Sequence, residues 1–266
     1  MMISVALPDQ APPPAIVEAA HQVPTRSTHQ VTTPDGVQIA FDLYQRPGRD
    51  TLLVICPGFF QSKNTPTMRQ LAATLAQHYD VLCMDFRGHG DSGGRFTFSA
   101  KEDADLTAVF TWARPRYAHI VLMGFSLGAA TAIDVIGEGT EVQALIAVSA
   151  PTAFEDIELK VWTLKAIVAG LKAFEPGVGF RPGNPWLTKP RPIDRIRQAK
   201  VPILLIHGTD DETTFVHHSQ ELFAQAEGPK QLTLIEGGRH AEELYRQDPE
   251  GFLTLVEDWL TTVPSR

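Results

Sequence analysis

The stretch IVLMGFSLGAATAIDVI, residues 120–136, is the most informative part of this sequence. It joins a short apolar run, residues 120–123, to a segment of small and apolar residues with helical spacing, and GFSLG (124–128) lies at the junction. This G-x-S-x-G pattern is typical of a serine on a tight turn between a strand and a helix. Side chains at its two glycines would collide with neighbouring backbone, so the tight turn requires small residues at these two positions. The pattern predicts a nucleophilic serine at Ser126.

Other apolar runs surround this stretch and alternate with segments of helical spacing. Continuous rather than alternating apolarity is typical of strands buried on both faces of a parallel sheet. Strands that alternate with helices imply a mostly parallel α/β sheet with helices on both faces. Two further strand-like runs, residues 29–33 and 37–44, flank the turn signal Pro34-Asp35-Gly36. The expected buried strands are residues 51–56, 81–84, 120–123, 144–148 and 203–206, and a further strand is expected at residues 232–235.

The chain divides into four parts by composition. Residues 1–26 are rich in proline, which removes backbone donors, so we expect an N-terminal extension there. Residues 27–151 and 200–266 carry the strand and helix patterns and form the two parts of one core. Residues 152–199 are too many for a simple connection, and we interpret them as an inserted cap with short helices of its own.

The overall composition restricts the class of protein. The chain has 266 residues, 43% of them hydrophobic and 20% charged, with a net charge of −8, which is typical of one large globular domain. No basic footprint for nucleic acid is present, and no apolar run reaches the ~18 residues that span a bilayer. No signal peptide is evident, and two cysteines make no disulfide framework. We therefore expect a cytoplasmic protein.

A serine nucleophile needs a base, and the base needs an orienting acid. The expected strand 203–206 is followed by HGTDD (207–211), and the expected strand 232–235 is followed by EGGRH (236–240). Open α/β sheets build their sites at the carboxyl ends of strands, where these segments lie. The pattern thus favours His240 as the base and one of two adjacent aspartates, Asp210 or Asp211, as the acid.

Four motifs together resemble those of α/β-hydrolase fold serine hydrolases, over about residues 28–261. They are PGFF (57–60), DFRGHGDS (85–92), the serine turn at 124–128, and the pair of segments that ends at residues 211 and 240. The resemblance implies an α/β-hydrolase fold with a cap. It also implies a catalytic triad of Ser126, Asp211 and His240, because the acid of such proteins follows the glycine of its His-Gly pair by three residues.

The same resemblance implies that the backbone N–H groups of Phe59 and Leu127 form the oxyanion hole. Relatives usually have His-Gly before the first of these donors, whereas this chain has Pro57-Gly58. The donor is a backbone group, so this departure leaves the expected chemistry possible while changing the loop. The chemistry is complete with side chains and backbone amides, so no cofactor is implied, and no metal site is expected.

A second G-x-S-x-G match, GDSGG (90–94), offers an alternative nucleophile, Ser92. It is similar to the serine loop of chymotrypsin-like proteases, but the remaining pattern of such a protease is missing. No helix pattern follows Ser92 directly, so its context favours a loop beside the site. The identity of the reactive serine distinguishes these two interpretations.

The leading hypothesis is hydrolysis of a carboxylic ester through an acyl-enzyme. Thioesters, amides and C–C bonds use the same constellation, and a non-catalytic member of the fold that binds a ligand or partner is the alternative from another class. The expected partner is a small-molecule acyl substrate. Aromatic residues predict an apolar pocket lined by Phe60, Phe96, Trp162 and Trp186, although buried aromatics are also ordinary core.

Overall fold

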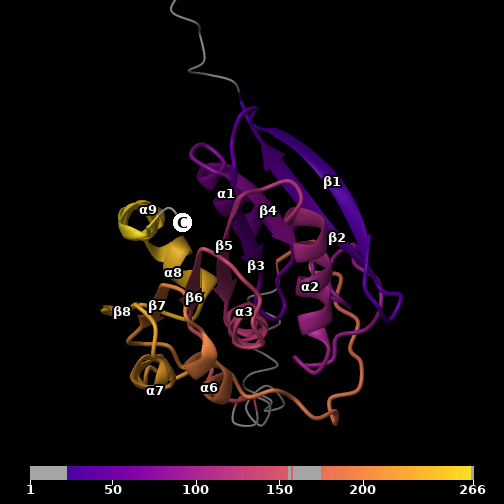
Figure 1. Cartoon of the computed structure of the whole chain (residues 1–266). Helices are drawn as coiled ribbons and strands as arrows, with labels where there is room; N and C mark the ends of the chain where they lie inside the picture. Colours follow the sequence, from indigo (N-terminus) through magenta and orange to yellow (C-terminus); the bar gives the residue numbers. More distant parts are fainter. Residues whose placement is uncertain (1–22, 155–156, 158–174, 265–266) are drawn as a thin grey trace, which may run out of the picture.

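An eight-stranded, mostly parallel sheet forms the centre of the protein (Figure 1). The computed structural model describes residues 23–154, 157 and 175–264. The strand order is β1-β2-β4-β3-β5-β6-β7-β8; β1 and β2 run antiparallel to their neighbours, and β3 to β8 are parallel. The strands are β1 (Thr25–Thr32), β2 (Gln38–Gln45), β3 (Thr51–Cys56), β4 (Asp80–Met84), β5 (His119–Phe125), β6 (Ala144–Val148), β7 (Ile203–Gly208) and β8 (Lys230–Ile235).

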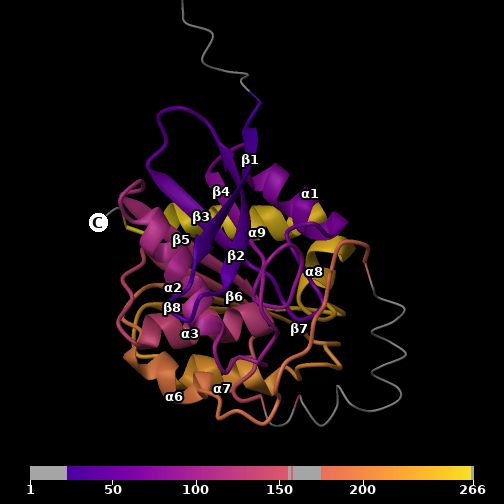
Figure 2. The same ribbon diagram turned by 90° about the vertical axis from the view of Figure 1, so that its right-hand side faces the viewer.

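Helices cover both faces of this sheet. One group, α2, α3 and α7, packs on one face, and α1, α8 and α9 pack on the other. The short α6 and η1 lie beside α3 and α7, as Figure 2 shows for α6. The described helices are α1 (Pro66–Leu75), α2 (Glu102–Ala113), α3 (Leu127–Gly137), α6 (Pro192–Arg195), η1 (Ile196–Gln198), α7 (His217–Gln225), α8 (Glu242–Gln247) and α9 (Pro249–Thr262).

The core explains why the strands read as continuous apolar runs. Along β3, Leu52 and Val54 are buried under α2 and α3, while Leu53 and Ile55 are buried under α1 and its neighbours. Successive side chains of a strand point to opposite faces, so a strand covered on both sides needs apolar residues at every position. The α/β fold with helices on both faces, expected from the sequence, is confirmed.

The first two strands differ from their expected bounds. The first strand-like run was expected at residues 29–33, but β1 begins at Thr25, inside the segment assigned to the N-terminal extension. Thr25 pairs with Gln45 and Thr32 pairs with Gln38 across the hairpin. Most of β1 is exposed and polar, so its start is set by pairing with β2 and not by an apolar pattern.

The predicted cap, residues 152–199, is described only in part. Residues 155–156 and 158–174 lie outside the described residues, and so does the predicted pocket residue Trp162. The described part from residue 175 onward runs along the 88–96 loop, where backbone hydrogen bonds join Arg181 to Gly88 (2.7 Å) and Phe96 to Arg181 (2.9 Å). Among the described residues, no helix combines the length and the apolar character that crossing a membrane requires.

Candidate active site

Ser126 lies on a sharp turn between β5 and α3. Its backbone has φ 49° and ψ −111°, a conformation that non-glycine residues rarely adopt. The flanking glycines permit the turn: a Cβ at Gly124 would lie 2.4 Å from the Cα of Ala129, and a Cβ at Gly128 would lie 2.1 Å from the carbonyl oxygen of Cys56. The Ser126 N–H donates to the carbonyl of Val148 on β6 (2.8 Å). Strand pairing therefore holds the strained residue in place.

The structure brings the three predicted catalytic side chains into one hydrogen-bonded line. The Nε2 of His240 lies 2.9 Å from the Oγ of Ser126, and its Nδ1 lies 2.8 Å from Oδ2 of Asp211. A carboxylate can only accept, so Nδ1 carries the proton and Nε2 of the neutral ring is free to accept the serine proton. This tautomer is the one that a general base next to Ser126 requires.

Asp211, and not the adjacent Asp210, faces the histidine. Asp211 is buried, and its Oδ1 accepts hydrogen bonds from the backbone N–H groups of Thr213 (2.9 Å) and Thr214 (2.8 Å). Asp210 is exposed, and its N–H donates to the carbonyl of Gly238 (2.9 Å). The two carboxylates therefore have separate surroundings, although they are neighbours in the chain.

The hydrogen bonds and charges around Asp211 favour its ionised form. Burial alone would raise the pKa of Asp211, but hydrogen bonds from His207 and His240 and the charge of His240 outweigh it, so the pKa lies well below its usual range. Burial likewise would lower the pKa of His240, but the hydrogen bond and charge of Asp211 raise it above its ordinary value. Each group thus stabilises the charged form of the other.

One predicted oxyanion donor, Leu127, lies in the serine turn, and the other, Phe59, lies in the loop that passes next to it. Leu127 is the first residue of α3, where the backbone N–H has no acceptor within the helix. Phe59 follows Gly58, whose added Cβ would lie 3.2 Å from the carbonyl oxygen of Phe125 and 3.5 Å from Cβ of Ser126. Pro57-Gly58 thus differs from the usual His-Gly pair at its first residue only, and the glycine is retained where the loop passes close to the serine.

An aromatic cluster lies next to these donors. The ring of Phe59 is 3.9 Å from that of Phe60 and 5.1 Å from that of Phe96, measured between centroids. Phe180, from the segment after the undescribed residues, is 4.9 Å from Phe60. Leu127 belongs to the same apolar cluster. Two of the predicted pocket residues, Phe60 and Phe96, therefore lie near the predicted oxyanion donors.

Trp186 does not join this cluster. Its side chain is 91% exposed, and none of the described ring contacts involves it. The sequence expectation that Trp186 lines an apolar pocket came from its aromatic character alone, and the segment places it in solvent within a proline-rich loop. Trp162, its proposed companion, lies outside the described residues.

Among the described residues, no base is hydrogen-bonded to the hydroxyl of Ser92. Its hydroxyl donates to the carbonyl of Asp85 (2.7 Å) and accepts from the N–H of Ala40 (2.8 Å), and the residue is 2% exposed. These bonds attach the loop after β4 to β2. Both hydrogen-bonding functions of this hydroxyl are occupied by backbone, which agrees with its interpretation as a loop residue.

Both cysteines and His89, which the proposed chemistry does not use, are buried. Burial raises the pKa of both Cys56 and Cys83, so these thiols stay protonated. His89 is buried between the rings of Phe96 and Phe180, and burial lowers its pKa to about 4, which keeps it neutral. In the described part of the chain, no three His, Cys, Asp or Glu residues are grouped as metal ligands.

Three residues at the site carried no signal in the sequence. Ser149 accepts a hydrogen bond from the N–H of Ala241, next to His240 (3.0 Å). Gln61 donates to Glu242 (2.8 Å), which joins the loop of Phe59 to the loop of His240. Each pair is far apart in the chain, and no local motif marks either one, so only the folded structure identifies them.

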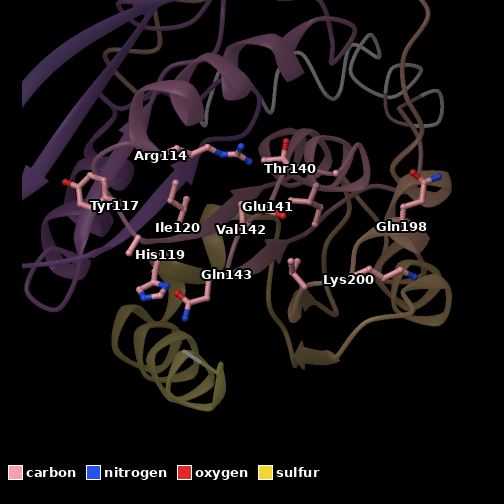
Figure 3. Close-up of a pocket in the computed structure, with 14 residues that line it drawn as sticks. Arg114, Tyr117, His119, Ile120, Thr140, Glu141, Val142, Gln143, Gln198 and Lys200 are labelled. Atoms are coloured by element: carbon pink, nitrogen blue, oxygen red, sulfur yellow. The ribbon is translucent and has the colours of Figure 1, made fainter. Parts of the chain in front are cut away.

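A separate hollow of about 580 Å³ opens at the opposite end of β5 (Figure 3). His119, at its edge, is the first residue of the strand that leads to Ser126. Lys200, a cationic residue that lines the hollow, forms an ion pair with Glu227 (2.6 Å). None of the predicted catalytic residues lines this hollow, so its position is unconnected with the serine.

The sequence matches the model of one protein family and is similar to several known proteins. A model of the alpha/beta hydrolase family matches residues 53–255. The uncharacterized protein YqkD of Bacillus subtilis strain 168 is 27% identical over 227 residues, which cover 77% of this chain and 72% of YqkD. Human alpha/beta hydrolase domain-containing protein 17B is 28% identical over 194 residues, which cover 69% of this chain and 58% of that protein.

Solved structures give the same fold. An esterase of Pyrococcus furiosus, Pf2001, superposes with a TM-score of 0.73 at 24% identity, over 91% of this chain and 94% of that one. The esterase RhEst1 of Rhodococcus sp. ECU1013 superposes with a TM-score of 0.70 at 19% identity, over 90% of this chain and 100% of that one. The sheet order and the serine turn define an α/β-hydrolase fold. With the family match over residues 53–255, the chain belongs to the alpha/beta hydrolase family.

Proposed function

We propose that this protein is a serine hydrolase that cleaves a carboxylic ester, with Ser126 as nucleophile, His240 as base and Asp211 as the orienting acid. The observation that carries the proposal is the contact of 2.9 Å between Nε2 of His240 and Oγ of Ser126, on a ring whose Nδ1 is held by Asp211. A nucleophile, a base and an orienting group in hydrogen-bond contact are the parts that acyl transfer requires.

In the first half of the reaction, Oγ of Ser126 attacks the ester carbonyl while Nε2 of His240 takes its proton. The carbonyl oxygen becomes an oxyanion, which accepts hydrogen bonds from the N–H groups of Phe59 and Leu127. His240 then gives its proton to the leaving alcohol as the carbon–oxygen bond breaks, which leaves an acyl group on Ser126. One lost oxyanion donor typically costs ~3 kcal/mol of transition-state stabilisation.

In the second half, water replaces the alcohol. His240 takes a proton from the water, whose oxygen attacks the acyl carbonyl, and the same two N–H groups stabilise the second oxyanion. The proton returns to Oγ of Ser126, and the carboxylic acid leaves. Asp211 keeps its charge throughout and stabilises the imidazolium in both halves.

The substrate proposed is small and largely apolar. Phe59, Phe60, Phe96 and Phe180 gather beside the candidate oxyanion donors, and apolar surface of this kind favours an apolar acyl or alcohol group. The structural neighbours named as esterases, Pf2001 and RhEst1, support an ester over an amide or thioester.

Labelling with a fluorophosphonate probe, followed by peptide mapping, tests the proposal without knowledge of the substrate. The probe phosphonylates serines that have a working base, so we expect label on Ser126 in the wild type and none in Ser126→Ala. Turnover of short p-nitrophenyl esters by the wild type should accompany the label. An unlabelled wild-type protein would favour a ligand-binding member of the family, and label on Ser92 would mean that the other motif holds the nucleophile.

A further inference from the structure

One side-chain hydrogen bond connects the two loops on which the proposed chemistry depends. Nε2 of Gln61 donates to Oε1 of Glu242 at 2.8 Å, between residues 181 positions apart. Gln61 lies two residues after Phe59, the proposed oxyanion donor, and Glu242 lies two residues after His240, the proposed base. The bond therefore joins the immediate surroundings of two groups that must act on the same carbonyl.

The structure holds Gln61 in one orientation. Its side-chain oxygen lies 2.7 Å from Oγ1 of Thr65, the residue that precedes α1, and this hydroxyl also lies 2.8 Å from the carbonyl of Ser62. The side-chain nitrogen of Gln61 faces the carboxylate. The residue is 5% exposed. Its backbone N–H donates to the carbonyl of Gly58 (3.2 Å), which closes the turn that contains Phe59. A displacement of Gln61 would therefore move the N–H of Phe59.

Glu242 is in a comparable position on the other loop. It is the first residue of α8, and the residue between it and His240, Ala241, has the strained backbone φ 49°, ψ −115°. The N–H of Ala241 donates to Oγ of Ser149, which is buried at the end of β6 beside Ser126. The loop of His240 is thus attached on one side to the serine turn and on the other side to Gln61.

We propose that Gln61 and Glu242 are a pair of positioning residues whose hydrogen bond sets the distance between the oxyanion donor Phe59 and the base His240. The inference rests on the proposed function, since these roles have meaning only for a serine hydrolase. The transition state requires the oxyanion donor and the base to be correctly placed relative to each other, whereas substrate binding alone does not. Loss of the bond should consequently lower kcat and leave KM nearly unchanged.

The experiment measures kcat, KM and melting temperature for Gln61→Leu, Glu242→Gln and Glu242→Leu, with a p-nitrophenyl ester that the wild type cleaves. Gln61→Leu should lower kcat about tenfold, which is the scale of one buried hydrogen bond to a charged group, with KM within about twofold. Glu242→Gln keeps an acceptor for Gln61 and should retain most of kcat. Glu242→Leu should match Gln61→Leu.

Two further variants separate positioning from general stability. The double variant Gln61→Leu/Glu242→Leu should be no slower than either single variant, because one shared bond can be lost only once. Gln45→Leu is the matched control, because it removes a side-chain amide whose Nε2 donates to Tyr117 (2.7 Å), far from the serine. It should lower the melting temperature about as much as Gln61→Leu does and leave kcat unchanged.

The outcomes distinguish this inference from the proposed function. Wild-type kcat in Gln61→Leu, losses that add in the double variant, or a rise in KM alone would overturn the positioning role while the esterase proposal stands. A wild type that neither cleaves esters nor takes the fluorophosphonate label would remove the proposed function itself, and this inference with it.

Discussion

The chain contains the same pentapeptide pattern twice, and the two copies have different structures. Ser126 lies between β5 and α3 with φ 49°, and its hydroxyl faces His240 at 2.9 Å. Ser92 lies in the loop after β4, where its hydroxyl is shared between the backbone of Asp85 and Ala40. The motif thus specifies small residues around a serine, and the elements on either side decide whether the hydroxyl meets a base or the backbone.

The glycines of the two copies also serve different needs. Gly128 has ordinary helical backbone but no room for a side chain, because its Cβ would lie 2.1 Å from a carbonyl oxygen. Gly94 has φ +69°, and its Cβ would meet only side-chain atoms, the nearest being Cγ1 of Val37 at 3.0 Å. Close approach of backbone to backbone is therefore required at one copy, and a left-handed turn is required at the other.

The largest expected difference between the copies is in turnover. Ser126→Ala should lower kcat by about 10³-fold or more, because the attacking oxygen is removed. Ser92→Ala should keep kcat within about twofold of the wild type when both are assayed on the same ester. Comparable losses of kcat in the two variants would mean that both serines take part in turnover, which would contradict the assignment of Ser126 as the nucleophile.

The next largest difference concerns the glycine at the fifth position of each motif. Gly128→Ala forces backbone to move and should cost at least about 2 kcal/mol of unfolding free energy together with most activity. Gly94→Ala strains a left-handed residue and should cost about 1 kcal/mol, with activity retained. Urea unfolding monitored by circular dichroism, with an ester assay on the folded fraction, measures both; equal activity losses would contradict the distinction.

A smaller effect is expected on the stability of the Ser92 loop. Ser92→Ala leaves a buried carbonyl of Asp85 and a buried N–H of Ala40 without their partner, which should cost about 1–3 kcal/mol. Thermal unfolding should show the loss as a lower melting temperature. Ser126→Ala is the matched control and should unfold at nearly the wild-type temperature, because the hydrogen bond given for its hydroxyl among the described residues is the one to His240.

The smallest expected effect is on the pH profile. In the proposed mechanism His240 acts as a base only when neutral, so kcat/KM should rise with pH through the pKa of His240. Asp211, Glu242 and Glu243 raise this pKa above its ordinary 6.5 against the effect of burial. Glu242→Gln removes one of these charges and should move the rise to lower pH. Ser92→Ala should leave it in place, and a displaced rise in that variant would tie the second loop to the base.

Much of the fold follows from local patterns. The expected strands at residues 51–56 and 144–148 match β3 and β6 residue for residue, because both are covered on two faces and need apolar side chains throughout. The edge strand β1 was expected to start later than it does, since its mostly exposed residues have no apolar pattern to mark the start. Pairing with a neighbour, which the sequence does not display, defines such a strand.

The candidate site likewise has residues that the sequence predicts and residues that it does not. Ser126 and Asp211 each follow a buried strand, and His240 follows the edge strand β8. The strand pattern and the family motifs therefore place all three at the carboxyl edge of the sheet. Trp186 shows the limit of reasoning from residue type, because an aromatic side chain in a proline-rich segment is equally compatible with a pocket and with solvent. The Gln61–Glu242 contact, across 181 residues, has no local pattern at all.

The sheet order has a consequence for how activity arises during synthesis. The strands β5, β6, β7 and β8 are added side by side in chain order, and His240 follows the last of them, 114 residues after Ser126. A nascent chain that has completed the serine turn therefore still lacks its base until the final strand has docked. Recovery of ester hydrolysis during refolding would then report the last step of assembly, whereas helix content would report earlier ones.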